Sequence, residues 1–169
     1  VEIVERFATR AFRRSLEAGE LEAYAKLAKP LLADDRPFVE ALRVPLRAVL
    51  SAPPFVYQAA APGALDDYAL ATRLSYFLWR SMPDAELFDL AGAGRLSDRH
   101  VLAEQVDRML DDVRHQRFVK DFAGQAFRLY EMRATAPDGG LYPEFDDRLA
   151  RAMERETELF LTELIARNE

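Results

Sequence analysis

Apolar residues recur three or four positions apart along almost the whole chain, which is the spacing of one face of an α-helix. The first stripe of this kind contains Val4, Phe7, Ala8, Ala11 and Phe12. No stretch shows a convincing two-residue alternation, which would be typical of a half-buried strand. We therefore expect an all-α fold with about eight helices.

Breaks in this pattern predict two helical modules. Pro53-Pro54 ends a helix of the first module, because proline lacks the amide donor and crowds the preceding turn. The run QAAAPGA follows over residues 58–64 and has the composition of a linker. We expect a small N-terminal helical module over residues 1–57, packed on a larger helical module over residues 65–169.

The last predicted helix still carries its apolar pattern at the end of the sequence, so we expect the larger module to be truncated there. Phe160, Leu161, Leu164 and Ile165 occupy more than one face of its last two turns. Such residues need cover on both sides. We expect that cover from further domains of a larger parent protein, or from a second copy of this chain in a homo-oligomer.

The paired aspartates and the clustered arginines of this sequence are both explained by the predicted helices. Each Asp-Asp pair lies near a predicted helix start, where carboxylates accept hydrogen bonds from free backbone amides. An arginine cluster near the N-terminus is interpreted as a polar face of the first helix. The pairs are Asp34-Asp35, Asp66-Asp67, Asp111-Asp112 and Asp146-Asp147, and the cluster is Arg6, Arg10, Arg13 and Arg14.

The composition and net charge favour some classes of structure and function and exclude others. Ala and Leu supply 50 residues against 12 for Val and Ile, which favours helix over sheet. The net charge of −6 disfavours nucleic-acid binding. The absence of cysteine excludes disulfides, thiolate catalysis and covalent c-type haem attachment within this chain. No apolar run approaches the length of a membrane span, so we expect none.

Metal and cofactor chemistry finds little support in the sequence. His100 and His115 are the two histidines, and Asp112 precedes His115 at the ligand-like i, i+3 spacing. Helical di-metal sites need Glu-x-x-His motifs, and this chain has none. Phosphate-binding loops, dinucleotide fingerprints and nucleophile elbows are absent as well. We expect no metal and no cofactor.

Two charged residues fall on apolar faces of predicted helices. Glu156 lies at the centre of the stripe of the last helix. Arg73 lies on a helix that is apolar almost all round. That stripe of the last helix consists of Phe145, Leu149, Ala152, Met153, Leu159 and Phe160.

Because an unpaired buried charge is costly, we predict that Arg73 and Glu156 contact each other or share one buried polar network. Gln125 and Tyr76 are candidate further members. This network is a structural ion pair or part of a catalytic or ligand-binding site. In the alternative arrangement the last helix is rotated and Glu156 faces solvent.

The run RLSYFLWRSMPD, residues 73–84, resembles the helical modules of large planctomycetal and myxobacterial-type proteins of uncharacterised function. ERFATRAFRR at residues 5–14 and EQVDRMLDDVRHQRFVKDFAGQ at residues 104–125 resemble the same proteins in the same order. Similar proteins are exported and multi-domain, and many carry a c-type cytochrome module. The resemblance implies a periplasmic or extracellular parent protein and no established catalytic residues.

Two functions remain open on these observations. The first is a non-catalytic helical scaffold or interaction module of a larger exported, redox-linked protein, whose partners are the other domains of that protein. The second is part of an enzyme that acts on carbohydrate or another polymer, with an active site completed by downstream residues. A deep pocket with convergent Glu156, Arg73 and Tyr76 would favour the enzyme, since fold by itself does not decide function.

Overall fold

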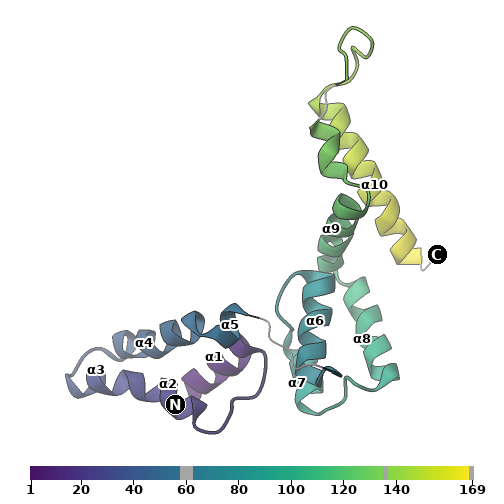
Figure 1. Cartoon of the computed structure of the whole chain (residues 1–169). Coiled ribbons are helices and arrows are strands. Elements are labelled where there is room, and N and C mark those ends of the chain that lie inside the picture. Colours follow the sequence, from purple (N-terminus) through teal and green to yellow (C-terminus); the bar gives the residue numbers. More distant parts are fainter. Residues whose placement is uncertain (58–62, 135–136, 168–169) are drawn as a thin grey trace. The chain divides into compact units, whose positions relative to one another are not determined.

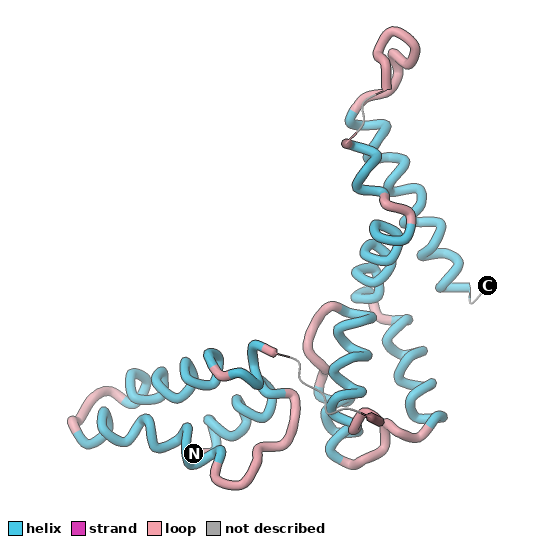
Figure 2. The backbone as a smooth tube through the Cα atoms, viewed as in Figure 1, coloured by secondary structure: helices cyan, strands magenta, loops and turns pink. Residues whose placement is uncertain are grey.

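The computed structural model describes residues 1–57, 63–134 and 137–167. These residues contain ten α-helical segments and three short 3-10 helices, with no strand among them (Figure 1, Figure 2). Two segments, α3 and α5, have only five and four residues, which leaves eight longer helices. The expected all-α fold of about eight helices is confirmed.

The two longest connections between the elements are residues 57–66 and 134–146. In chain order the elements are α1 (Glu2–Phe12), α2 (Glu20–Ala25), η1 (Lys26–Ala28), α3 (Lys29–Ala33), α4 (Phe38–Ser51), α5 (Pro53–Val56), α6 (Asp67–Trp79), α7 (Ala85–Gly92), α8 (Arg99–Asp111), η2 (Val113–His115), α9 (Gln116–Ala126), η3 (Leu129–Arg133) and α10 (Asp147–Arg167).

Internal contacts divide the chain into two compact units. The first comprises Val1–Arg73 with Met82–Asp98, and the second comprises Leu74–Ser81 with Arg99–Glu169. The division passes through α6, which supplies residues to both units. The expected linker over 58–64 falls mostly on residues 58–62, which lie outside the described residues, and the expected module boundaries stay a prediction.

In the first unit, α1 packs against α4 and buries the stripe that the sequence indicates. Phe12 is central to this core, and its ring centroid lies 5.7 Å from that of Tyr24. Small residues dominate the remaining contacts, which lets the helix axes approach closely. The buried cluster consists of Ala8, Ala11, Phe12, Val49 and Ala52.

Arg13 corrects the interpretation of the N-terminal arginines as one polar face. Its side chain is buried, and its guanidinium donates hydrogen bonds to the carbonyl oxygens of Pro54 at 2.9 Å and Phe55 at 3.1 Å. Arg13 also ends α1 in the left-handed conformation, with φ at 56°. The end of α1 turns its side chain inward, where it satisfies carbonyl groups of α5.

Aspartates cap helices at several of the predicted places. Asp66 accepts a hydrogen bond from the amide of Ala69 at 2.7 Å. Asp146 accepts one from the amide of Leu149 at the start of α10, also at 2.7 Å. Capping of this kind stabilises a helix start by about 1 kcal/mol. Asp67 is different, because its buried carboxylate accepts from the amide of Leu96 at 2.7 Å.

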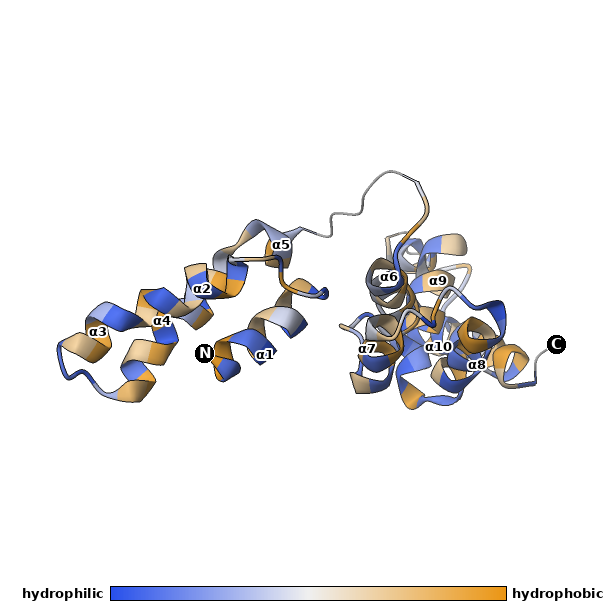
Figure 3. Cartoon of the chain, turned by 90° about the horizontal axis from the view of Figure 1, so that it is seen from below, coloured by the Kyte–Doolittle hydropathy of each residue, from blue (hydrophilic) through white to orange (hydrophobic). Residues whose placement is uncertain are grey.

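In the second unit, α9 packs along α10 and also contacts η2 and η3 (Figure 1). Its core contains Trp79, Met109 and Val119, together with two alanines that bring the helices close, Ala123 and Ala150. Hydrophobic and hydrophilic segments alternate around the helices, as Figure 3 shows for α4 and α8. Within the described residues, no helix combines the length and the apolar character needed to cross a membrane.

Candidate functional site

Trp79 fixes the carboxyl end of α6 within the second unit. Its indole is fully buried, and Nε1–H donates a hydrogen bond to the carbonyl oxygen of Met109 at 2.9 Å. The carbonyl oxygen of Trp79 in turn accepts a hydrogen bond from the guanidinium of Arg117 at 2.9 Å. The last turn of α6 is therefore tied to both α8 and α9, which sets the positions of the residues beside it.

Two guanidinium groups lie over the indole of Trp79. The central carbon of Arg114 is 3.3 Å from the ring centroid, and that of Arg108 is 5.4 Å from it. Arg114 also donates to both carboxylate oxygens of Asp112, at 2.8 and 2.7 Å. These hydrogen bonds hold the pKa of Asp112 well below its ordinary value. The ion pair with Asp112 thus balances the charge that Arg114 places on the indole.

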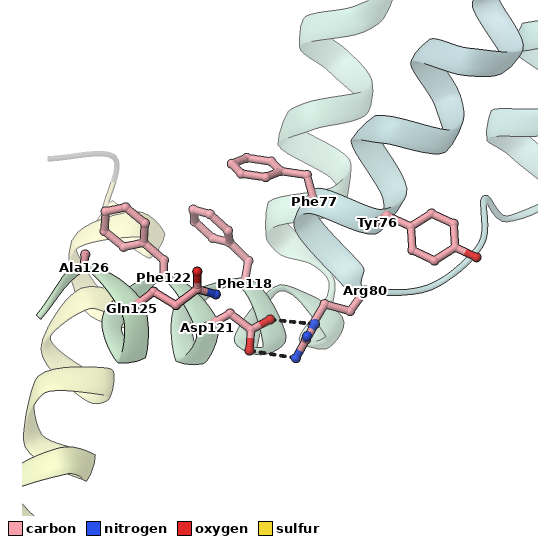
Figure 4. A pocket seen from close by; sticks show the side chains of 8 residues that line it. All are labelled: Tyr76, Phe77, Arg80, Phe118, Asp121, Phe122, Gln125 and Ala126. Carbon is pink, nitrogen blue, oxygen red and sulfur yellow. Dashed lines mark hydrogen bonds and ion pairs between the residues drawn. The ribbon is translucent and has the colours of Figure 1, made fainter. Parts of the chain in front are cut away.

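An open groove of about 590 Å³ lies beside this anchor, between the end of α6 and one face of α9 (Figure 4). Phe77 is 62% exposed, and its ring centroid lies 4.9 Å from that of Phe118. Phe122 continues the row, with its ring stacked on Phe118 at 5.6 Å. We call this the α6–α9 groove, and it is lined by Tyr76, Phe77, Arg80, Phe118, Asp121, Phe122, Gln125 and Ala126.

An ion pair closes one end of the α6–α9 groove. Arg80 donates to both carboxylate oxygens of Asp121, at 2.8 and 2.7 Å (Figure 4). Arg80 adopts the left-handed conformation at φ 51°, which ends α6 and directs the side chain toward α9. A second open pocket of about 570 Å³ lies beside the same ion pair and is lined additionally by Arg117 and Lys120.

The structure brings two of the four predicted site residues to this groove. Tyr76 and Gln125 both line it, although no hydrogen bond joins them. Arg73 and Glu156 do not line it, and both side chains are exposed. The predicted burial of these two charges is therefore wrong, and the alternative arrangement, in which α10 is rotated and Glu156 faces solvent, is the one observed.

The rotation of α10 has a clear physical reason. Its inner face against α8 and α9 is formed by Leu161, Leu164 and Ile165, which together with residues of those helices line a cavity of about 340 Å³. These three residues supply enough apolar surface to dock the helix. The stripe around Glu156 is then left outside, with Met153 and Phe160 exposed.

The histidine pattern also finds a structural explanation. His115 donates from Nδ1 to the carbonyl oxygen of Asp112 at 2.8 Å, while its Nε2 is buried without a hydrogen-bond partner in the described part of the chain. The carboxylate of Asp112 is already bonded to Arg114. Across residues 1–57, 63–134 and 137–167, no cluster of three or more His, Cys, Asp or Glu side chains could hold a metal ion.

Sequence reasoning missed the phenylalanine row and the Arg80–Asp121 pair. Phe118 and Phe122 line this groove and also the cavity that the inner face of α10 lines. The residues that α9 buries fully are Val119 and Ala123, one position further along. The pair Val119 and Ala123, spaced i, i+4, could have indicated the buried face of α9, because small side chains allow two helices to approach most closely.

The α6–α9 groove offers surfaces that can bind an apolar or polar ligand group. Stacked aromatic rings offer apolar surface and π-faces, and the Arg80–Asp121 pair offers fixed donors and acceptors at its edge. Tyr76 is the only hydroxyl-bearing residue among the eight that line the groove, and none of the eight is a histidine. These residues therefore provide no pairing of a nucleophile with a histidine base.

Comparisons with known proteins agree with a helical module of unknown role. Residues 65–169 match the model of a family described as "Protein of unknown function (DUF1592)". Residues 1–59 match that of a second family, described as "Protein of unknown function (DUF1595)". No curated protein and no solved structure matches the chain. The expected likeness to helical domains of unknown function is thereby confirmed.

Proposed function

Because the chain belongs to the family described as "Protein of unknown function (DUF1592)", whose model matches residues 65–169, we propose that it is a non-catalytic interaction module of a larger protein. The observation that supports this role is the row of Phe77, Phe118 and Phe122 in the α6–α9 groove. Phe77 and Phe122 remain 62% and 49% exposed, and a row of exposed rings is a surface that docking partners use as an anchor.

We further propose that the larger protein is exported to the periplasm or the extracellular space and is linked to a redox module. This part of the proposal is supported by the resemblance of residues 5–14, 73–84 and 104–125 to modules of exported, multi-domain proteins. In such a protein the module holds neighbouring domains in place. Its partners are then the other domains of the same chain or the same assembly.

Hydroxyl-radical footprinting of phenylalanine side chains tests the docking role. We expect Phe77 and Phe122 to be modified several-fold more slowly in the full-length parent protein than in this chain alone at low concentration. Phe38 in α4 is the matched control, since it is 59% exposed and lies outside the groove. Equal modification rates in both proteins would overturn the proposal, and so would hydrolysis of a polysaccharide by this chain alone.

A further inference from the structure

Helix α10 carries apolar residues on two faces, and only one of them is covered. The inner face packs on α8 and α9 through Leu161, Leu164 and Ile165. A second set follows the spacing 4, 3, 4, 3 along the helix and stays exposed. We call this set the outer stripe, and it consists of Leu149, Met153, Glu156, Phe160 and Glu163.

The outer stripe has the character of an acidic amphipathic helix. Phe160 is its largest apolar residue and is 62% exposed. Glu156 makes no ion pair with another described residue, and Glu163 pairs only with Arg167 on the surface, at 2.7 Å. The stripe spans roughly 20 Å at 1.5 Å per residue, which is a length that a groove-bound helix presents.

The surface around the α6–α9 groove has the opposite charge. Arg117 and Lys120 lie beside the Arg80–Asp121 pair, and neither of them forms an ion pair with a described carboxylate. The aromatic row of the groove therefore runs next to two cations. Arg117 is hydrogen-bonded to the carbonyl oxygen of Trp79, and Lys120 also lines a pocket with Glu154 and Glu158 of α10. This combination matches the outer stripe in both respects, since apolar residues meet rings and carboxylates meet cations.

We propose that the outer stripe of α10 in one copy of this chain docks in the α6–α9 groove of a second copy. The inference rests on the proposed interaction role and names its partner. Phe160 and Met153 cover the rings of Phe77 and Phe118, while Glu156 and Glu163 approach Lys120 and Arg117. One contact then covers the outer stripe and the aromatic row together.

Such a contact joins two different surfaces, so it has a distinctive mixing behaviour. A stripe variant, Phe160→Ser, keeps its groove, and a groove variant, Phe77→Ser, keeps its stripe. Each variant alone loses the contact with itself. A mixture of the two retains one productive contact and forms a heterodimer that cannot grow further.

Sedimentation velocity over a concentration series tests the inference. We expect the parent sequence to self-associate, and Phe160→Ser and Phe77→Ser each to weaken that association about tenfold or more. The equimolar mixture of the two variants should form a one-to-one heterodimer. Phe38→Ser is the matched control and should associate like the parent sequence, and circular dichroism checks that every variant is folded.

A charge exchange provides a second set of variants at exposed positions. Lys120→Glu and Glu156→Lys should each weaken self-association, because each places like charges opposite each other. Mixing the two should restore association, since each stripe then meets a groove of opposite charge. Restoration of this kind excludes misfolding as the cause of the single effects.

Three results would overturn the inference: a monomeric parent sequence at every concentration, undiminished association of either phenylalanine variant, or no heterodimer in the mixture. Undiminished association of Phe160→Ser would indicate a contact between two grooves, and that of Phe77→Ser a contact between two stripes. If the chain is monomeric while footprinting still finds its groove protected in the larger protein, the proposed function stands and only the second-copy partner fails.

Discussion

At the scale of single residues, Trp79 connects the core of the second unit to the groove. Its indole N–H and its carbonyl oxygen are both hydrogen-bonded, and a guanidinium group lies against its ring. Any change that loosens this side chain also loosens the last turn of α6, which carries Phe77 and Arg80. The packing of Trp79 and the positions of the groove residues Phe77 and Arg80 therefore depend on the same helix end.

We expect Trp79→Phe to lower the free energy of unfolding by about 2–4 kcal/mol, because it leaves the carbonyl oxygen of Met109 unpaired and opens a cavity. Urea unfolding followed by circular dichroism measures this, since Trp79 is the single tryptophan and its fluorescence is lost with it. The exposed Phe127→Leu is the control and should change stability by less than about 0.5 kcal/mol. An unchanged Trp79→Phe midpoint would contradict the anchor.

Asp112 predicts a pH dependence with a definite sign. Hydrogen bonds from Arg114 lower its pKa from the ordinary value of 3.8, so its contribution to stability is present above that value and is lost as the pH falls through the lowered pKa. We expect Asp112→Asn to be less stable than the parent sequence at pH 7, with a difference that shrinks as the pH is lowered below 3.8. Equilibrium unfolding at several pH values measures it, and a constant difference would contradict it.

Glu156 and Arg73 illustrate which residue properties a sequence reveals. Their positions on helical faces were assigned from spacing, and that spacing is correct. Whether a face is covered depends on the neighbouring elements, which the sequence of one helix does not specify. Arg13 makes the opposite case, because a residue expected on the surface is buried by carbonyl groups of α5 that are 41 and 42 positions away.

Glu156→Gln and Arg73→Met should therefore change the free energy of unfolding by less than about 0.5 kcal/mol each, because neither charge is buried. If the two charges formed a buried pair, removing either one would instead lower the free energy of unfolding by several kcal/mol. Thermal unfolding at low protein concentration, where copies do not associate, measures it. A loss of about 3 kcal/mol for either variant would restore the buried-pair prediction.

At the scale of elements, helix positions followed from the sequence and helix rotations did not. Periodicity, prolines and capping aspartates locate helices, since these signals are local. The predicted rotation of α10 was wrong, because this helix carries apolar residues on more than one face. In such helices the face with the smaller residues, such as Ala123 and Ala150, gives the closer packing and is the one that is buried.

The two faces of α10 should respond differently to truncation. We expect Leu164→Ala on the inner face to lower the free energy of unfolding by about 1–2 kcal/mol, since it removes contacts with α8 and α9. Phe160→Ala on the outer stripe should have little effect in the monomer and a large one on self-association. Urea unfolding at low concentration, beside sedimentation at high concentration, separates these effects. Equal losses of stability for both variants would contradict the assignment of the faces.

At the scale of the whole molecule, the first unit offers a small core for its length. The cluster around Phe12 and Val49 is built largely from alanines, which bury little apolar area each. We expect residues 1–57 alone to be marginally stable, as chains below about 60 residues usually are. A circular dichroism melt of that segment should be broad and without a cooperative transition, whereas a sharp transition would show that it folds independently.

The fold class and the helices could thus be predicted from local patterns in the sequence. The groove could not, because it depends on the left-handed turn at Arg80 and on the way α9 is rotated against α6. Both depend on contacts between helices that are distant in the sequence. Tyr76 and Gln125 line the groove, but the buried network with Arg73 and Glu156, for which they were proposed, is not formed.

The two-faced helix α10 has a consequence for how substitutions are tolerated along it. If only the inner face mattered, sensitive positions would recur once per turn, with a period of 3.6 residues. The outer stripe lies about 100° around the helix from the inner face, since Phe160 and Leu161 are consecutive residues. If the outer stripe is also held in a contact, the sensitive positions widen to neighbouring pairs that still recur once per turn. A complete substitution scan of 147–167, scored for assembly, would then show one broad sensitive arc around the helix, whereas a scan scored for folding of the monomer would show a narrow one.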